Sequence, residues 1–88
     1  MPDKVTIVTV TRNDVENLRN TIDSVLSQTY ENREYIVIDG GSTDGTCELL
    51  RKYEHGIDVW LSEPDEGIFH AMNKGAERAT GDWILFLN

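Results

Sequence analysis

Apolar residues in this chain follow two patterns, compact runs and a wider helical spacing, and the two alternate along the sequence. The compact runs are rich in β-branched or aromatic residues and each predicts a strand: Lys4 to Val10, Glu34 to Ile38, Ile57 to Leu61 and Trp83 to Leu87. The run from Tyr35 to Ile38 has no polar interruption. Such a run is typical of a strand that is buried on both faces, as in a parallel sheet.

Between these runs, apolar residues recur at the three- and four-residue spacing of an amphipathic helix. The predicted helices span Val15 to about Gln28, about Cys47 to Tyr53, and Ile68 to Ala79. Asn13 or Asp14 is expected to cap the first helix. Gly56 is expected to end the second in the left-handed conformation, and Gly81 to stop the third.

The order of elements, β-α-β-α-β-α-β, predicts an α/β fold of the Rossmann-like type. It would have three layers, with a mainly parallel four-stranded sheet between helices on both faces. Residues 1–88 contain no repeat or linker and form one unit. In a parallel sheet the loops that follow the strands leave at the same edge. We therefore expect the loops beginning at Thr11, Asp39 and Glu63 to converge on one crevice, which would be the binding site.

The segment YIVIDGGSTDGT, residues 35–46, carries the most information about that site. It places Asp39 at the carboxyl end of a buried strand, where a carboxylate can accept hydrogen bonds from a nucleotide base or ribose. Gly40 and Gly41 let the backbone turn sharply and approach a ligand closely. The alternative is an ordinary strand-to-helix turn in which Thr43 or Asp44 caps the next helix. The residues alone leave both interpretations open.

The composition of the chain limits which ligands it could bind and in which cellular compartment it could lie. The net charge is −8, from 16 acidic and 8 basic residues, which argues against a nucleic-acid-binding surface. A phosphate-bearing ligand would need a divalent cation or a few well-placed basic groups to offset that charge. The single cysteine, Cys47, forms no internal disulfide and predicts a reducing compartment. No apolar run approaches the ~20 residues that span a bilayer.

The sequence ends one residue after the predicted strand from Trp83 to Leu87. A hydrophobic strand at a chain end is poorly covered, so we expect a truncated domain. Self-association through the exposed apolar surface would then be a reasonable consequence.

Four segments, in this order, resemble the nucleotide-binding half of a family 2 glycosyltransferase with the GT-A fold. The first segment is TRN after the first predicted strand, together with the helix that ends in SVLSQTY (Ser24 to Tyr30). The other three are VIDGGSTDGT, SEPDEGIFHAMNKG (Ser62 to Gly75) and ATGDWILFLN (Ala79 to Asn88). The resemblance covers nearly the whole chain. It is greatest to the bacterial subgroup that builds surface polysaccharides such as capsule and exopolysaccharide.

The resemblance implies an enzyme that transfers a sugar from a nucleotide-sugar donor, usually UDP-linked, to an acceptor hydroxyl with inversion. The acceptor would be a saccharide or a lipid-linked molecule. The resemblance also implies that the protein is located in the cytoplasm, where the full-length protein could lie at the inner face of the membrane. Carried over by position, the donor-binding residues are Thr11, Arg12, Asn13, Asp39, Gly40, Gly41, Asp65, Asn73 and Lys74. Many relatives have a second acid where Gly40 stands and a diphosphate-binding arginine where Met72 stands, with Lys74 the nearest cation.

The resemblance also implies a divalent metal, Mg²⁺ or Mn²⁺, in the full-length enzyme. Its Asp-x-Asp-type ligands would start just after Asn88, and the general base would lie further on. We therefore expect no catalytic residue and no metal ligand within residues 1–88, and no transferase activity from them alone. Two other interpretations remain: a non-catalytic nucleotide-sugar-binding or assembly module, and a flavodoxin-like signalling domain with Asp39 as phosphate acceptor.

Overall fold

The computed structural model describes residues 3–28 and 30–88, and it confirms the predicted order of elements. The strands are β1 (Val5–Thr11), β2 (Arg33–Asp39), β3 (Val59–Ser62) and β4 (Trp83–Phe86). The α-helices are α1 (Val15–Leu26), α2 (Thr46–Lys52) and α3 (Ile68–Arg78), and a short 3₁₀ helix, η1 (Glu54–Gly56), follows α2.

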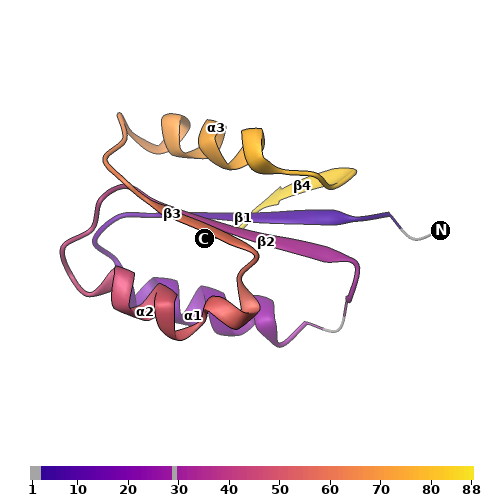
Figure 1. Ribbon diagram of the computed structural model, residues 1–88, viewed down its shortest axis with the longest axis horizontal. Coiled ribbons are helices and arrows are strands. Elements are labelled where there is room, and N and C mark those ends of the chain that lie inside the picture. Colours follow the sequence, from indigo (N-terminus) through magenta and orange to yellow (C-terminus); the bar gives the residue numbers. More distant parts are fainter. Residues whose placement is uncertain (1–2, 29) are drawn as a thin grey trace.

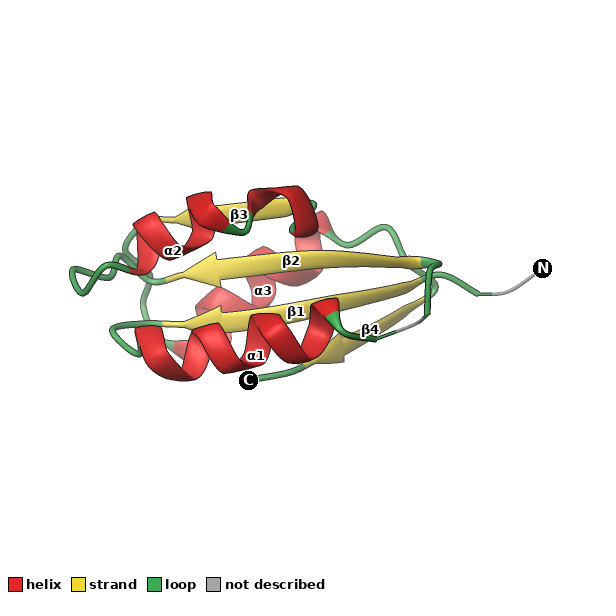
Figure 2. Cartoon of the chain, turned by 90° about the horizontal axis from the view of Figure 1, so that it is seen from below, coloured by secondary structure: helices red, strands yellow, loops and turns green. Residues whose placement is uncertain are grey.

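The strands form one parallel sheet in the order β3-β2-β1-β4. Helices α1 and α2 cover one face and α3 covers the other, so the predicted three layers are confirmed (Figure 1). All four strands point the same way (Figure 2). Thr11 pairs with Asp39, and Asp39 pairs with Ser62, so β1, β2 and β3 end level with one another. The loops that follow them therefore leave at one edge, as the sequence predicts.

The middle strand β2 is buried on both of its faces, as its continuous apolar run predicts. Tyr35 and Val37 pack in a cluster with α1 and α2, whereas Ile36 and Ile38 pack in a second cluster with α3. All four side chains are fully buried. Alternating residues of a strand point to opposite faces, so one unbroken run supplies both halves of the core.

Helix α3 packs closely on the sheet because its inner face carries small residues. Ala71 is buried against Val8, and a Cβ atom placed on Gly75 would lie only 2.5 Å from the Val8 Cγ1 atom. No Cβ atom fits at that distance, so glycine at this position allows the close approach of α3 to β1.

Two details differ from the sequence predictions. The third strand begins at Val59 rather than Ile57, because pairing with β2 starts only at Val59, opposite Ile36, after η1 has ended at Gly56. The left-handed conformation expected at Gly56 is wrong: the described glycines with positive φ are Gly41, Gly45 and Gly67. Gly56 instead allows close packing, since a Cβ there would lie 2.7 Å from Leu26 Cδ2.

Strand β4 is the least covered part of the sheet. It pairs with β1, and its side chains from Trp83 to Phe86 are all exposed. The turn before it is fixed by Glu34, whose carboxylate accepts hydrogen bonds from Thr80 and Thr6. Burial raises the pKa of Glu34, but these hydrogen bonds and the Lys4 ammonium more than offset that effect, so the pKa is lowered.

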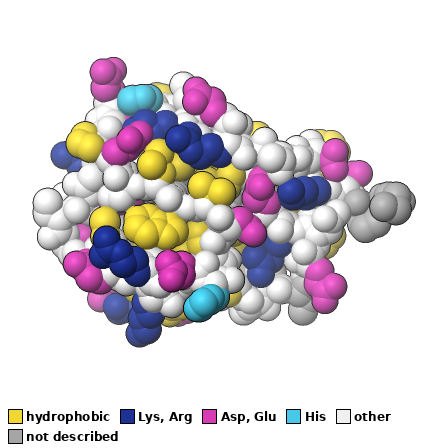
Figure 3. Space-filling model, in the orientation of Figure 1, with side chains coloured by type: hydrophobic (Ala, Val, Ile, Leu, Met, Phe, Trp, Pro, Cys, Tyr) yellow, Lys and Arg dark blue, Asp and Glu magenta, His cyan; other side chains and the backbone are white. Residues whose placement is uncertain are grey.

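The surface seen in Figure 3 carries acidic and basic side chains that are scattered over it, with apolar side chains between them. Among the described residues, no helix is both long enough and apolar enough to cross a membrane.

Candidate functional site

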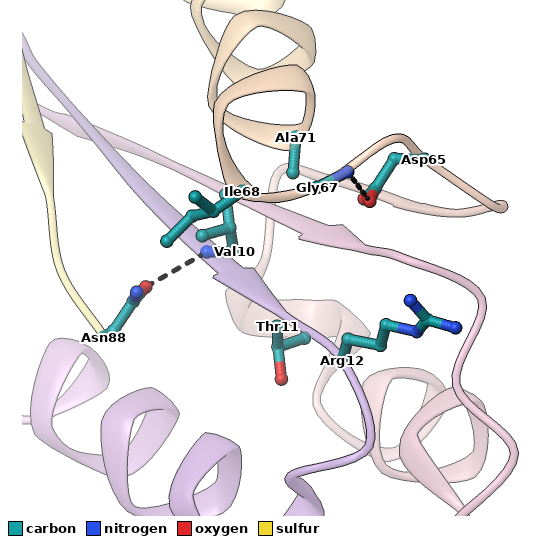
Figure 4. A pocket seen from close by; sticks show the side chains of 8 residues that line it. All are labelled: Val10, Thr11, Arg12, Asp65, Gly67, Ile68, Ala71 and Asn88. Carbon is teal, nitrogen blue, oxygen red and sulfur yellow. Dashed lines mark hydrogen bonds between the residues drawn. The ribbon is translucent and has the colours of Figure 1, made fainter.

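A hollow of about 210 Å³ opens where the carboxyl ends of β1 and β4 lie side by side. Strands β2 and β3 lie on one side of β1, and β4 lies on its other side, so the order of strands reverses at β1. Open α/β sheets bind ligands at such a reversal of strand order. The residues that line the hollow are Val10, Thr11, Arg12, Asp65, Gly67, Ile68, Ala71 and Asn88 (Figure 4).

The β4 side of the hollow is held by hydrogen bonds to β1. The Asn88 Oδ1 atom accepts a hydrogen bond from the Val10 amide at 3.2 Å, which Figure 4 shows. The Thr9 hydroxyl donates to the Leu87 carbonyl at 2.7 Å, so it accepts from the Tyr35 hydroxyl at 2.9 Å. Burial raises the pKa of Tyr35, with the Thr9 hydrogen bond opposing it, so the phenol stays protonated as this donor role requires.

Arg12 is the one basic residue among the described residues that line the hollow. Its side chain is exposed, extends away from Val10, Thr11 and Asn88 (Figure 4), and makes no hydrogen bond or ion pair with any described residue. An unpaired guanidinium is suited to bind phosphate or carboxylate groups in a bidentate manner. In a chain of net charge −8, it supplies the local positive charge that an anionic ligand needs.

Asp65 reaches the hollow from the loop after β3. Its Oδ1 atom accepts a hydrogen bond from the Gly67 amide at 3.0 Å. A Cβ atom on Gly40 would lie 2.8 Å from Asp65 Oδ2, so glycine at position 40 lets Asp65 approach the end of β2. Gly41 has a φ of 87°, which favours glycine. Both glycines thus shape the site through close packing and backbone conformation.

Asp39 lies at the end of β2 but is fully buried and does not line the hollow. Its Oδ2 atom accepts hydrogen bonds from the Ser42 amide at 2.9 Å and the Ser62 hydroxyl at 2.7 Å. Its Oδ1 atom accepts a hydrogen bond from the Ser42 hydroxyl. In this structure the carboxylate joins the ends of β2 and β3, and its contact with a base or ribose stays a prediction.

The side chain of Asn13 lies against the loop that follows β2, not in the hollow. Its Oδ1 atom accepts a hydrogen bond from the Thr43 amide at 2.8 Å, and the Asn13 amide donates to the Ser42 hydroxyl at 2.7 Å. The loop after β1 is therefore joined directly to the loop after β2.

The interpretation of Asp44 as the cap of the helix after it is wrong. The α2 N-cap residue is Gly45, and Asp44 Oδ2 instead accepts a hydrogen bond from the Val15 amide, at the start of α1, at 3.1 Å. Asp14 is the N-cap residue of α1, but its side chain makes no capping hydrogen bond. The carboxylate of Asp44 therefore caps α1 from a neighbouring loop.

Lys74 and Asn73 lie on α3 outside the set of residues that line the hollow. The Lys74 ammonium pairs with Glu63 Oε1 at 3.0 Å and donates to the Pro64 carbonyl at 3.2 Å. It therefore fixes the loop after β3. Asn73 is exposed and makes no side-chain hydrogen bond with any described residue. A direct contact of either residue with a donor stays a prediction.

Sequence reasoning missed five residues of the hollow: Val10, Gly67, Ile68, Ala71 and Asn88. Asn88 could have been found from the strand order, since the residue after β4 must lie beside the end of β1 once those strands pair. Ile68 and Ala71 were recognised only as part of a helical pattern. Their position over the end of β1 depends on the crossover of α3.

No group of three or more His, Cys, Asp or Glu side chains that could hold a metal ion occurs in the described part of the chain. The described residues therefore do not fit a metal site by themselves, and we assign no metal ligand among them.

The fold and the hollow at the strand reversal define an α/β domain with a candidate ligand site at the carboxyl edge of its parallel sheet. The model of the family described as glycosyl transferase family 2 matches residues 6–88, so this chain belongs to that family. Membership argues against the signalling-domain alternative, and the fully buried, hydrogen-bonded Asp39 is likewise unsuited to accept a phosphoryl group.

Known proteins similar to this chain are glycosyltransferases. An uncharacterised glycosyltransferase of Mycobacterium tuberculosis is 45% identical over 85 residues, which cover 96% of this chain and 32% of that protein. A PGL/p-HBAD biosynthesis glycosyltransferase of Mycobacterium bovis is 36% identical over 84 residues, which cover 92% of this chain and 33% of that protein. The chain thus spans about a third of the length of these relatives.

The mannosyltransferase PcManGT from Pyrobaculum calidifontis, solved in complex with GDP-Man and Mn²⁺, has the same fold. Its TM-score is 0.86 at 26% identity, over 96% of this chain and 26% of that one. The GT-A type of fold expected from the sequence is therefore confirmed.

Proposed function

We propose that this chain is the donor-binding part of a glycosyltransferase and that the hollow between β1 and β4 receives the nucleotide-sugar. The observation that carries the proposal is the unpaired Arg12 guanidinium at that hollow, at the reversal of strand order of a family 2 chain. A nucleotide-sugar carries a diphosphate, which an arginine can bind through two parallel hydrogen bonds.

Within this proposal the predicted site residues take different roles. Thr11, Arg12 and Asp65 line the hollow and are proposed to contact the donor. Gly40 allows the close approach of Asp65, and Gly41 adopts a positive φ in the turn after β2. Lys74 and Asp39 support the loops around it through the contacts described above. The contribution of these residues to the reaction is orientation of the donor.

For the whole protein, we propose transfer of the sugar to an acceptor hydroxyl with inversion, in the synthesis of a polysaccharide or glycoconjugate in the cytoplasm. A carboxylate outside the described residues would remove the proton from the acceptor hydroxyl. We also propose a divalent metal, which would supply positive charge to the diphosphate when bound. Residues 1–88 alone are proposed to lack transferase activity, and sugar transfer by this stretch in isolation would contradict that statement.

The nucleotide is proposed to be UDP, as in many members of the family. The solved mannosyltransferase similar to this chain carries GDP-Man, so both nucleotides belong in the test. Titration of the intact protein with UDP and with GDP, each with Mn²⁺, would show which base the site prefers.

Replacement of Arg12 by alanine should weaken binding of the preferred nucleotide roughly tenfold, because a hydrogen bond to a charged group is lost. Isothermal titration calorimetry on the intact protein measures the dissociation constant. Arg51 provides the matched control: its side chain is exposed on α2, makes no hydrogen bond or ion pair with any described residue, and does not line the hollow. Equal dissociation constants for Arg12→Ala, Arg51→Ala and the wild type would contradict the proposed site.

A further inference from the structure

Asn13 has a backbone conformation that needs support from its surroundings. Its φ is 49°, and it is the one non-glycine residue with positive φ in the described part of the chain. Side chains other than glycine disfavour this left-handed region, although asparagine tolerates it better than most. The residue immediately follows Arg12, and only the N-cap residue Asp14 separates it from α1, so its conformation helps to set the direction in which the loop leaves the hollow.

Three residues of the next loop hold Asn13 and the helix start that follows it. The Thr43 amide donates to Asn13 Oδ1, the Asn13 amide donates to the Ser42 hydroxyl, and the Val15 amide donates to Asp44. The loop from Ser42 to Asp44 therefore contacts both main-chain and side-chain atoms of the segment after β1.

The orientation of Ser42 within these contacts is fixed by its chemistry. A hydroxyl has one proton to donate, and Ser42 gives it to Asp39 Oδ1. The lone pairs of the Ser42 oxygen are then available to accept from the Asn13 amide. A continuous chain of hydrogen bonds thus runs from the loop after β1 through Ser42 to the buried carboxylate that joins β2 and β3.

The segment containing Arg12 is held on both sides of that residue. On one side the Thr11 carbonyl accepts a hydrogen bond from the Gly40 amide at 2.9 Å. On the other side lie the contacts of Asn13. Between them the Arg12 side chain makes no hydrogen bond or ion pair with the described residues. This arrangement fixes the main chain of the segment and leaves its cation free.

We infer that Asn13 is a positioning residue for donor binding: it holds the Thr11–Arg12 segment in place and does not itself contact the nucleotide-sugar. The inference rests on the proposed function of the hollow. Its physical basis is preorganisation, since a loop fixed before binding loses less conformational freedom when the ligand arrives.

Two substitutions separate positioning from direct contact. Asn13→Gly keeps the left-handed conformation available but removes the Oδ1 acceptor. Asn13→Asp keeps an acceptor for the Thr43 amide and replaces the side-chain NH₂ group by an anionic oxygen. We expect Asn13→Gly to weaken nucleotide binding about fivefold, as expected for loss of one intramolecular hydrogen bond. Asn13→Asp should stay within roughly threefold of wild type, because an exposed charge is screened by salt.

The experiment measures dissociation constants of UDP and GDP with Mn²⁺ for the intact wild-type protein, both single variants, and the double variant Arg12→Ala/Asn13→Gly. If Asn13 acts through Arg12, the glycine substitution adds little further loss once Arg12 is gone, so the two effects are not additive. Additive effects, or an aspartate variant as weak as the glycine variant, would overturn the inference in favour of a direct or unrelated role.

Amide hydrogen exchange supplies a readout that does not depend on the ligand. The Thr43 amide should exchange faster in Asn13→Gly than in the wild type, and at the wild-type rate in Asn13→Asp. Unchanged Thr43 exchange in the glycine variant would overturn the inference even if nucleotide binding is weakened. Wild-type protein that binds neither nucleotide would instead refute the proposed function, which keeps the two failures distinct.

Discussion

The two halves of the carboxyl edge of the sheet are built in opposite ways. Between β1 and β2 the loops are joined by hydrogen bonds that use Asn13, Ser42 and Asp44, and the buried carboxylate of Asp39 extends this set to β3. Between β1 and β4 the edge opens into a hollow, where Arg12 has no partner among the described residues. The same strand, β1, borders both halves.

The difference shows how one edge can combine hydrogen-bonded loops with an open hollow. Polar groups in the closed half satisfy one another, so they stabilise the loops and offer little to a ligand. The open half leaves a cation and a hydroxyl, those of Arg12 and Thr11, without side-chain partners among the described residues. The predicted site residues divide accordingly: Asn13 and Asp39 join the loops, whereas Thr11, Arg12 and Asp65 line the hollow.

The largest expected effect is on stability in the closed half. Asp39→Ala removes the buried acceptor for three hydrogen bonds and should lower the free energy of unfolding by about 3 kcal/mol, because the half-buried donors of Ser42 and Ser62 lose their partner. Arg12→Ala, in the open half, should change it by less than about 0.5 kcal/mol. Urea denaturation of the intact protein compares the two, and similar losses for both variants would remove the distinction between the halves.

A smaller effect is expected where the open half is anchored to the core. Tyr35→Phe removes the hydrogen bond from the buried phenol to Thr9, which in turn holds Leu87, and should cost about 1 kcal/mol. Tyr53→Phe is the matched control, since its hydroxyl bonds to Asp23 near the surface. The same urea titration should show a clearly smaller loss for the control. Equal losses would mean that the core hydrogen bond does not anchor this side.

The smallest expected effect is the acid titration of Asp44, in the closed half. The Thr46 hydroxyl lowers its pKa, partial desolvation opposes this, and the Val15 amide lowers it further, so the carboxyl should titrate below its usual 3.8. Because the pKa is depressed on folding, the stabilisation is present above the usual pKa and is lost as the pH falls through the folded value.

Carboxyl ¹³C NMR of the intact protein measures the Asp44 titration directly. Thr46→Val removes the hydroxyl that donates to Asp44 Oδ1 at 2.6 Å and should shift the pKa upward, towards 3.8. An unchanged titration in that variant would show that the Thr46 hydrogen bond is not the cause.

The strands and their common edge could be predicted from the sequence because their signals are local. The run from Tyr35 to Ile38 indicated a strand covered on both faces, and alternating sides of that strand do pack against different helices. The convergence of the loops at Thr11, Asp39 and Glu63 followed from parallel pairing alone.

The partners across the loops could not be predicted in the same way, because they depend on strand order and on contacts between distant residues. Asp44 lies next to a helix in the sequence, so capping rules assign it to that helix. In space the first amide of α1 is a better-placed donor. Likewise, Asn88 belongs to the hollow only because β4 pairs with β1 and not with β3.

The absence of a side chain at Gly75 has a consequence for the other end of its helix. Because α3 meets Val8 with no room for a methyl group, this contact helps to set how far Ile68, about two turns away along the helix, lies from the end of β1. An alanine at position 75 would push α3 away from β1 and widen the hollow, although residue 75 itself does not line it.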